Sequence, residues 1–131
     1  GDDTLGDADS DTLNVNSVSN FNSLTKLKSK VSLHSSSELT ISTGAVTATK
    51  SYHTVDTEGD AASDDLATIN GGVEGMIIIL QAAHNDRTIS LKDGTGNLRL
   101  AGDFNLNSTD DTIQLIYNGS NWCEITRSDN G

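Results

Sequence analysis

The sequence contains no proline, a single cysteine and few aromatic residues. Because proline makes up about 5% of average proteins, its absence leaves the turns to glycine, asparagine and aspartate, which tolerate a positive φ. Cys123 alone excludes an intrachain disulfide and every metal site that needs several cysteines. The longest apolar run, residues 76–80, is far too short to span a bilayer, and no secretion signal is readable. We therefore expect a soluble chain without membrane insertion.

Basic residues are also scarce. Lys and Arg total 8 whereas Asp and Glu total 19, so the formal charge is −11. Such a surface repels nucleic-acid phosphate and anionic membranes, which makes both poor partners. Hydrophobic residues make up 34%, below the roughly 45–50% of an ordinary globular chain, so a lone monomer would have a thin core. The chain begins with Gly1, which favours a processed product or a fragment.

Alternation of apolar and polar residues dominates the first fifty positions. It predicts extended segments within residues 11–21 and 24–34, and two strands joined by a Gly44 turn within residues 38–49. These strands have a weak apolar face and little in their own chain to bury it, which favours intertwining with copies of the same molecule. The residues expected to be buried between copies are Leu13, Val15, Leu27, Val31, Leu33, Leu39 and Ile41.

Residues 53–75 are rich in small and acidic residues and interrupt this pattern. Ser63 is a suitable N-cap followed by two aspartates, so we expect one short helix here, ending at Gly71 and Gly72. Residues 76–83 are apolar apart from Gln81, which is typical of a strand covered on both faces. Further short strands are expected within residues 87–92, 97–101, 103–106, 111–117 and 122–127.

These patterns predict an all-β fold. Residues 1–50 form an extended, strand-rich arm for oligomerisation, and residues 51–131 form a compact domain, either a β-sandwich or a short β-helix-like structure. The arm favours an intertwined oligomer.

No catalytic, cofactor-binding or metal-binding residue is predicted. Asp7, Asp9 and Asp11 resemble the start of a calcium loop, but Thr12 stands where that loop requires glycine, so a solvated acidic turn is the simpler interpretation. The histidines lack a metal-ligand spacing, and no serine lies in a nucleophile elbow. We therefore expect no enzyme activity and no cofactor.

Two features have both a functional and a structural interpretation. Lysines 26, 28 and 30 either contact an acidic partner, such as a neighbouring copy, or protect an exposed strand edge. Trp122 is a candidate ligand contact because a tryptophan can stack on a sugar ring, although it more often caps a core near a turn. We favour the cap, which makes Cys123 a small buried hydrophobe.

Residues 93–102 ("DGTGNLRLAG") and 115–128 ("LIYNGSNWCEITRS") resemble motifs of a module found in structural proteins of tailed bacteriophages, especially fibre proteins. The resemblance is strongest from residue 51 onward, while the front part is similar to shaft segments of such proteins. It implies a homotrimeric, β-rich virion component with no cofactor.

The resemblance leads us to expect a non-enzymatic structural component of the phage virion surface. We expect a trimeric fibre or fibre-tip domain that contacts other virion proteins of the capsid or tail and, as a candidate ligand, host surface polysaccharide. The alternatives are a capsid decoration protein or head fibre that stabilises the capsid, and a polysaccharide-degrading enzyme. Its expected location is the extracellular virion, after synthesis in the host cytoplasm.

Overall fold

A computed structural model describes residues 12–34 and 38–131. The chain divides into two units, the second of which begins at Ser32. From here on, "the arm" means residues 12–34, which are a part of the arm expected over residues 1–50. These residues contain no strand or helix, so the extended segments expected there do not pair as strands within one chain. The large apolar side chains of the arm are all exposed, and they are Leu13, Val15, Val18, Phe21, Leu24, Leu27, Val31 and Leu33.

Residues 38–131 are all-β, as the sequence predicted. The strands are β1 (Leu39–Thr40), β2 (Ala45–Thr47), β3 (Tyr52–Asp56), β4 (Ser63–Leu66), β5 (Thr68–Asn70), β6 (Ile77–Ala82), β7 (Thr88–Leu91), β8 (Leu98–Arg99), β9 (Phe104–Leu106), β10 (Thr112–Tyr117) and β11 (Trp122–Ser128). Within this range the only helical turn is the 3₁₀ turn η1 (Glu58–Asp60). Nowhere in the described parts of the chain is a helix long and apolar enough to cross a membrane.

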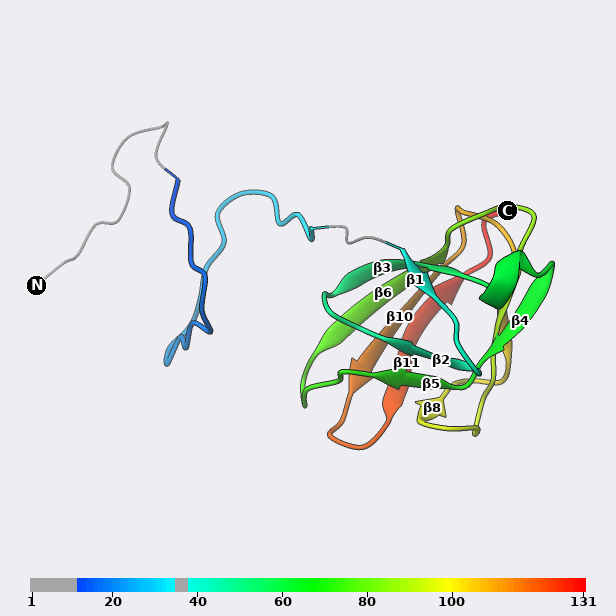
Figure 1. Ribbon diagram of the computed structural model, residues 1–131. Coiled ribbons are helices and arrows are strands. Elements are labelled where there is room, and N and C mark those ends of the chain that lie inside the picture. The colour runs from blue at the N-terminus through cyan, green and yellow to red at the C-terminus, as the bar shows by residue number, and fades with distance from the viewer. Residues whose placement is uncertain (1–11, 35–37) are drawn as a thin grey trace, which may run out of the picture. The chain divides into compact units, whose positions relative to one another are not determined.

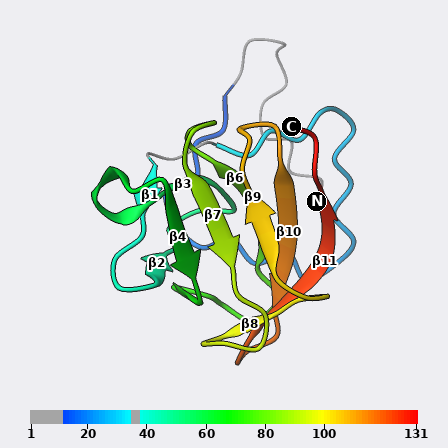
Figure 2. The same ribbon diagram turned by 90° about the vertical axis from the view of Figure 1, so that its right-hand side faces the viewer.

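The strands form three sheets. Sheet A has the order β1-β3-β6-β10-β11-β8, sheet B contains β2 and β5, and sheet C has the order β4-β7-β9. Figure 1 shows the long strands of sheet A side by side, and Figure 2 shows β4, β7 and β9 of sheet C. The chain passes from β3 in sheet A to β4 in sheet C, to β5 in sheet B and back to β6 in sheet A. This solenoid-like arrangement is the β-helix-like alternative of the two predicted architectures.

Successive coils stack in parallel register. Tyr52 of β3 pairs with Ile79 of β6, 27 positions later, and Ser63 of β4 pairs with Thr88 of β7, 25 positions later. The first coil is shorter, because Leu39 pairs with Val55 only 16 positions later. The first coil turns directly from β1 to β2 and contributes no strand to sheet C.

The core lies between the three sheets and is closed by antiparallel strands. Strand β10 pairs with β6 on one side and with β11 on the other. Inward side chains of all three sheets form one apolar cluster, whose fully buried members include Ile41, Leu66, Ile69, Ile78, Leu80, Ile89, Leu91, Leu98, Leu106, Ile113, Leu115 and Trp122. The stacked coils therefore bury aliphatic side chains on every inner face.

Two expectations from the sequence require correction. The short helix expected from Ser63 is wrong, because residues 63–70 form β4 and β5. Pairing of β4 with β7 outweighs the local capping signal, since it places Leu66 in the core. The compact unit also begins earlier than residue 51, because Ile41 and Val46 of the first coil are buried in its core. The strands expected after residue 76 are confirmed.

Candidate functional site

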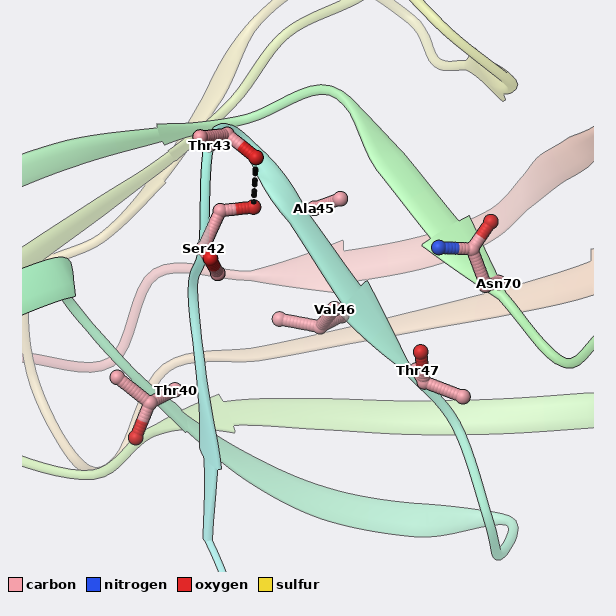
Figure 3. Close-up of a pocket in the computed structure, with 7 residues that line it drawn as sticks. All are labelled: Thr40, Ser42, Thr43, Ala45, Val46, Thr47 and Asn70. Carbon is pink, nitrogen blue, oxygen red and sulfur yellow. Dashed lines mark hydrogen bonds between the residues drawn. The ribbon is translucent and has the colours of Figure 1, made fainter.

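The first coil carries a shallow hollow of about 370 Å³ (Figure 3). Its lining contains hydroxyl groups, one amide and a small apolar area, and no charged side chain. The lining residues are Thr40, Ser42, Thr43, Ala45, Val46, Thr47 and Asn70. A surface of this kind can form hydrogen bonds with a polar ligand, but it offers no acid, base or strong nucleophile with which to transform it.

A tight turn shapes one wall of the hollow. Ser42 and Ala45 exchange two backbone hydrogen bonds of 2.9 and 3.1 Å across the two residues Thr43 and Gly44. Both central residues have a positive φ, 50° for Thr43 and 77° for Gly44, as in the two-residue turns typical of hairpins. Gly44 adopts this conformation without strain, whereas the branched side chain of Thr43 is strained in the left-handed region.

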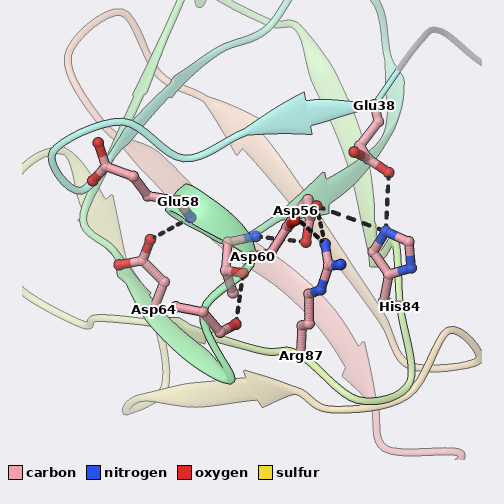
Figure 4. Close-up of polar contacts among 9 residues, drawn as sticks. Glu38, Asp56, Glu58, Asp60, Asp64, His84 and Arg87 are labelled. Carbon is pink, nitrogen blue, oxygen red and sulfur yellow. Dashed lines mark hydrogen bonds and ion pairs between the residues drawn. The ribbon is translucent and has the colours of Figure 1, made fainter.

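A second candidate site is a cluster of charged side chains near the end of β3 (Figure 4). Arg87 Nη1 lies 2.5 Å from Asp56 Oδ2 and 2.8 Å from Asp60 Oδ1. On the other side, His84 Nε2 lies 3.7 Å from Asp56 Oδ2 and 3.6 Å from Glu38 Oε2. The stacking of coils brings these residues together, because Asp56 ends β3 whereas His84 and Arg87 lie in the turn between β6 and β7.

Asp56 is the centre of this cluster and is only 5% exposed. Burial by itself raises the pKa of its carboxyl group, but the Arg87 hydrogen bond and the Thr57 amide outweigh burial and hold the pKa below its ordinary value. The carboxyl group is therefore ionised near neutral pH. It joins β3 to the β6–β7 turn through a charge-assisted hydrogen bond from Arg87.

Glu38, Asp56 and His84 offer three potential metal ligands within 4.8 Å of one another. Their fit to a metal ion is poor, because Asp56 Oδ2 already accepts a hydrogen bond from Arg87 at 2.5 Å. A cation at this position would have to displace the guanidinium group or be repelled by it. The arrangement is best described as an ion-pair network that fixes the strand ends.

Trp122 lies in the core and does not reach the surface. It is 0% exposed, its Nε1 donates a hydrogen bond of 2.9 Å to the Ile69 carbonyl, and its ring lies 5.0 Å from that of Tyr117. A ligand at the surface therefore cannot stack on this ring, and its placement is that of a core residue. Cys123, which the sequence suggested was buried, is partly exposed because it points to the opposite side of β11.

The residues expected to lie between copies fall into two groups. Ile41 is 1% exposed and belongs to the core of its own chain, and Leu39 is partly buried against the same core. Neither side chain is freely available to a second copy. The remaining members of the set lie exposed in the arm, and they are Leu13, Val15, Leu27, Val31 and Leu33. Their role as an interface stays a prediction.

Two polar residues with important structural roles were missed from the sequence. The Asn97 side chain accepts a hydrogen bond from the Ile69 N–H and donates one to the Ile69 carbonyl, as a neighbouring strand would. Asp111 is fully buried, and its carboxylate accepts hydrogen bonds from four backbone N–H groups, those of Asn107, Ser108, Asn130 and Gly131. Both residues lie at turn positions, where the sequence signals only a turn.

Comparisons with known proteins give no assignment: no family model matches this chain, and no match was found among curated proteins or solved structures.

Proposed function

We propose that this chain is a non-enzymatic structural subunit of a tailed-phage virion surface, which forms a homotrimeric fibre or fibre-tip domain. The observation that carries the proposal is the contrast between the arm and residues 38–131. A solenoid with a well-filled core is continuous with an arm whose eight large apolar side chains are exposed. Apolar side chains left in water at this density are typical of a surface that another chain covers.

The energy available from covering the arm is large. Fully burying one Val, Leu or Phe side chain contributes about 1.5–3 kcal/mol, so even partial burial of this set would stabilise an assembly by many kcal/mol. The arm has three lysines and no acidic residue, whereas acidic residues outnumber basic ones more than twofold in residues 38–131. Opposite charge therefore favours contact between the arm of one copy and the solenoid of another.

The pKa shifts of the carboxyl groups favour a structural role over glycosidase activity. A glycosidase needs one carboxylic acid whose pKa is raised so that it can donate a proton. Among the described residues, each carboxyl group with a clearly shifted pKa has it lowered, by hydrogen bonds from cationic side chains or from backbone N–H groups against the opposing effect of burial. These residues are Asp56, Asp103, Asp111 and Glu124.

The virion assignment rests on the resemblance of residues 51–131 to the phage fibre module. A capsid decoration protein or head fibre has the same structural requirements and differs in its place on the particle. Copy number per virion separates these alternatives, because a tail fibre is present in far fewer copies than a decoration protein. Purified particles and quantitative mass spectrometry would provide that number.

Substitution of Val31 by aspartate tests the assembly directly. We expect Val31→Asp to dissociate the oligomer of the full chain, because a charge would replace an apolar side chain at the buried interface. The matched control is Ser32→Asp, which adds the same charge to the neighbouring polar position and should leave the mass unchanged. Native mass measured by light scattering gives the result. An unchanged trimer in Val31→Asp would contradict assembly through the arm.

A further inference from the structure

The outer face of sheet A carries large apolar side chains on its central strands. In β6, Ile78, Leu80 and Ala82 point into the core, so Ile77 and Ile79 point outward on the opposite face. The sequence predicted a strand covered on both faces here, yet only the inner face is covered by the core of this chain. Ile77 remains 41% exposed. The outward face of β6 therefore carries large apolar side chains that the core of this chain does not cover.

Neighbouring strands extend this apolar surface. Ile79 pairs with Tyr52 of β3, Ile77 pairs with Ile116 of β10, and Ile116 pairs with Cys123 of β11. Cross-strand partners point to the same side of a sheet, so these side chains form one continuous patch. Ile125, at the register shift between β10 and β11, adds a further apolar side chain that is 48% exposed.

The other two sheets differ from sheet A. In β7 of sheet C the partly exposed positions are Thr88 and Ser90, and in β9 the exposed position is Asn105. Sheet B exposes Thr47 and Asn70. These faces follow the usual pattern of antiparallel or mixed sheets in water, with apolar side chains inside and polar side chains outside. The apolar outer face is therefore specific to sheet A.

We propose that the outer face of sheet A, the patch centred on Ile79 and Ile116, is an interface between copies of this chain. The remaining outward positions of β3, β6 and β10 are threonine and glutamine, apart from Asp56 at the end of β3, which is buried and paired with Arg87. Arg99 of β8, which pairs with Cys123, is the exposed charge at the edge of the patch. The uncharged centre of the patch matters because the chain carries a charge of −11, and contact between copies through most other surfaces would bring like charges together. Here, two copies can approach over the centre of the patch without that repulsion.

The rim of the patch is held in place by side-chain hydrogen bonds. Tyr52 Oη donates to Gln81 Oε1 at 2.5 Å, and Gln81 Nε2 donates to the Thr109 carbonyl at 3.0 Å. These bonds satisfy polar groups at the edge of the patch within one chain. An approaching copy therefore meets Tyr52 and Gln81 side chains that are already fixed, which reduces the entropy lost on association.

The sheet face is too small to form a stable interface without the arm. Because assembly through the arm is the proposed function, this inference rests on it. Six residues of β6 span about 20 Å, and four strands spaced about 4.8 Å apart give a face on the order of 300–400 Å². A stable interface buries about 800 Å² on each partner. The sheet face supplies roughly half of that area, and the exposed apolar side chains of the arm would supply the remainder.

Two matched substitutions in the full chain test this interface. Ile79→Asp places a charge at the centre of the patch, and Ser90→Asp places the same charge at a partly exposed position in the central strand of sheet C. We expect Ile79→Asp to raise the dissociation constant at least about a hundredfold, since like charges forced together cost several kcal/mol. We expect Ser90→Asp to leave it unchanged. Sedimentation equilibrium measures both constants.

Cys123 provides a second, independent measurement because it lies within the patch and is the only cysteine. Its thiol should react slowly with a maleimide in the wild-type oligomer and rapidly in Ile79→Asp, while Ser90→Asp should behave as the wild type. An Ile79→Asp chain that keeps the wild-type mass and thiol protection would overturn the sheet interface. In that case Val31→Asp still decides whether the arm assembles the chain.

Circular dichroism establishes whether Ile79→Asp folds. If it does not, Ile79→Thr replaces it, because threonine is also β-branched and keeps the strand while removing apolar surface. Weakened association of Ile79→Thr, relative to the wild type, supports the interface, and unchanged association overturns it. A wild-type chain that stays monomeric at every concentration would contradict both this inference and the proposed assembly.

Discussion

The carboxylate of Asp111 offers a sharp test of how the closing strands are held. It is fully buried, and each of its two oxygens accepts hydrogen bonds from two backbone N–H groups. Asp111→Asn keeps one oxygen and turns an NH₂ group toward two N–H donors, which then lose their acceptor. Each orphaned donor costs about 1–3 kcal/mol when buried, but Asn130 and Gly131 are exposed, so their N–H groups can turn toward water. We therefore expect a loss of about 2–3 kcal/mol.

The stability that Asp111 contributes should also depend on pH. Burial opposes ionisation, but the four N–H groups outweigh it and lower the pKa of Asp111 in the folded chain. Because the pKa of Asp111 is lower in the folded than in the unfolded chain, its carboxylate stabilises the fold at pH values above the unfolded pKa of about 3.9. This stabilisation is lost as the pH falls through the pKa of the folded chain. The difference in stability between wild type and Asp111→Asn should therefore be largest near pH 7 and should narrow below about pH 4.

Thermal unfolding followed by circular dichroism measures both parts. A loss of 2–3 kcal/mol lowers the Tm of a domain of this size by roughly 10–20 °C. The matched control is Asp110→Asn, since the neighbouring Asp110 side chain is exposed and its substitution should change the Tm little. If both variants unfold at the same temperature, or if the difference between them is as large at pH 2 as at pH 7, the reasoning about Asp111 is refuted.

Two further substitutions probe the core and the first turn. Trp122→Phe should lower the free energy of unfolding by about 2 kcal/mol, because it leaves a cavity and removes the hydrogen bond to the Ile69 carbonyl; a chemical denaturation curve that matches wild type would contradict this. Thr43→Asn should raise the free energy of unfolding by about 1 kcal/mol, since asparagine tolerates a positive φ better than a β-branched residue; a lower Tm would show that Thr43 is not strained.

The sequence predicts the later strands well because each has a strong local signal. Residues 76–83 and 111–117 combine β-branched residues with turn residues at both ends, and both form strands of sheet A. The strand β4 lacks such a signal, since "SDDL" contains a single apolar residue. Its conformation is imposed by stacking on β7, which no short window of sequence reveals.

The candidate site could not be predicted for a related reason. Asp56 lies 28 and 31 positions before His84 and Arg87, and only the parallel stacking of coils brings it into contact with them. The length of a coil is set by its turns, and these vary, so the spacing of partners is not constant. The apolar outer face of sheet A was partly visible in advance, because an uninterrupted apolar run at residues 76–80 predicts a strand covered on both sides.

The most direct test of the proposed assembly is the native mass of the unmodified chain over a wide range of concentrations. Sedimentation equilibrium should give a mass three times that of one chain, 13.8 kDa, with little dependence on concentration. A homogeneous 13.8 kDa species at every concentration would show that the chain needs no partner copy to cover its arm, and would contradict a trimeric structural subunit.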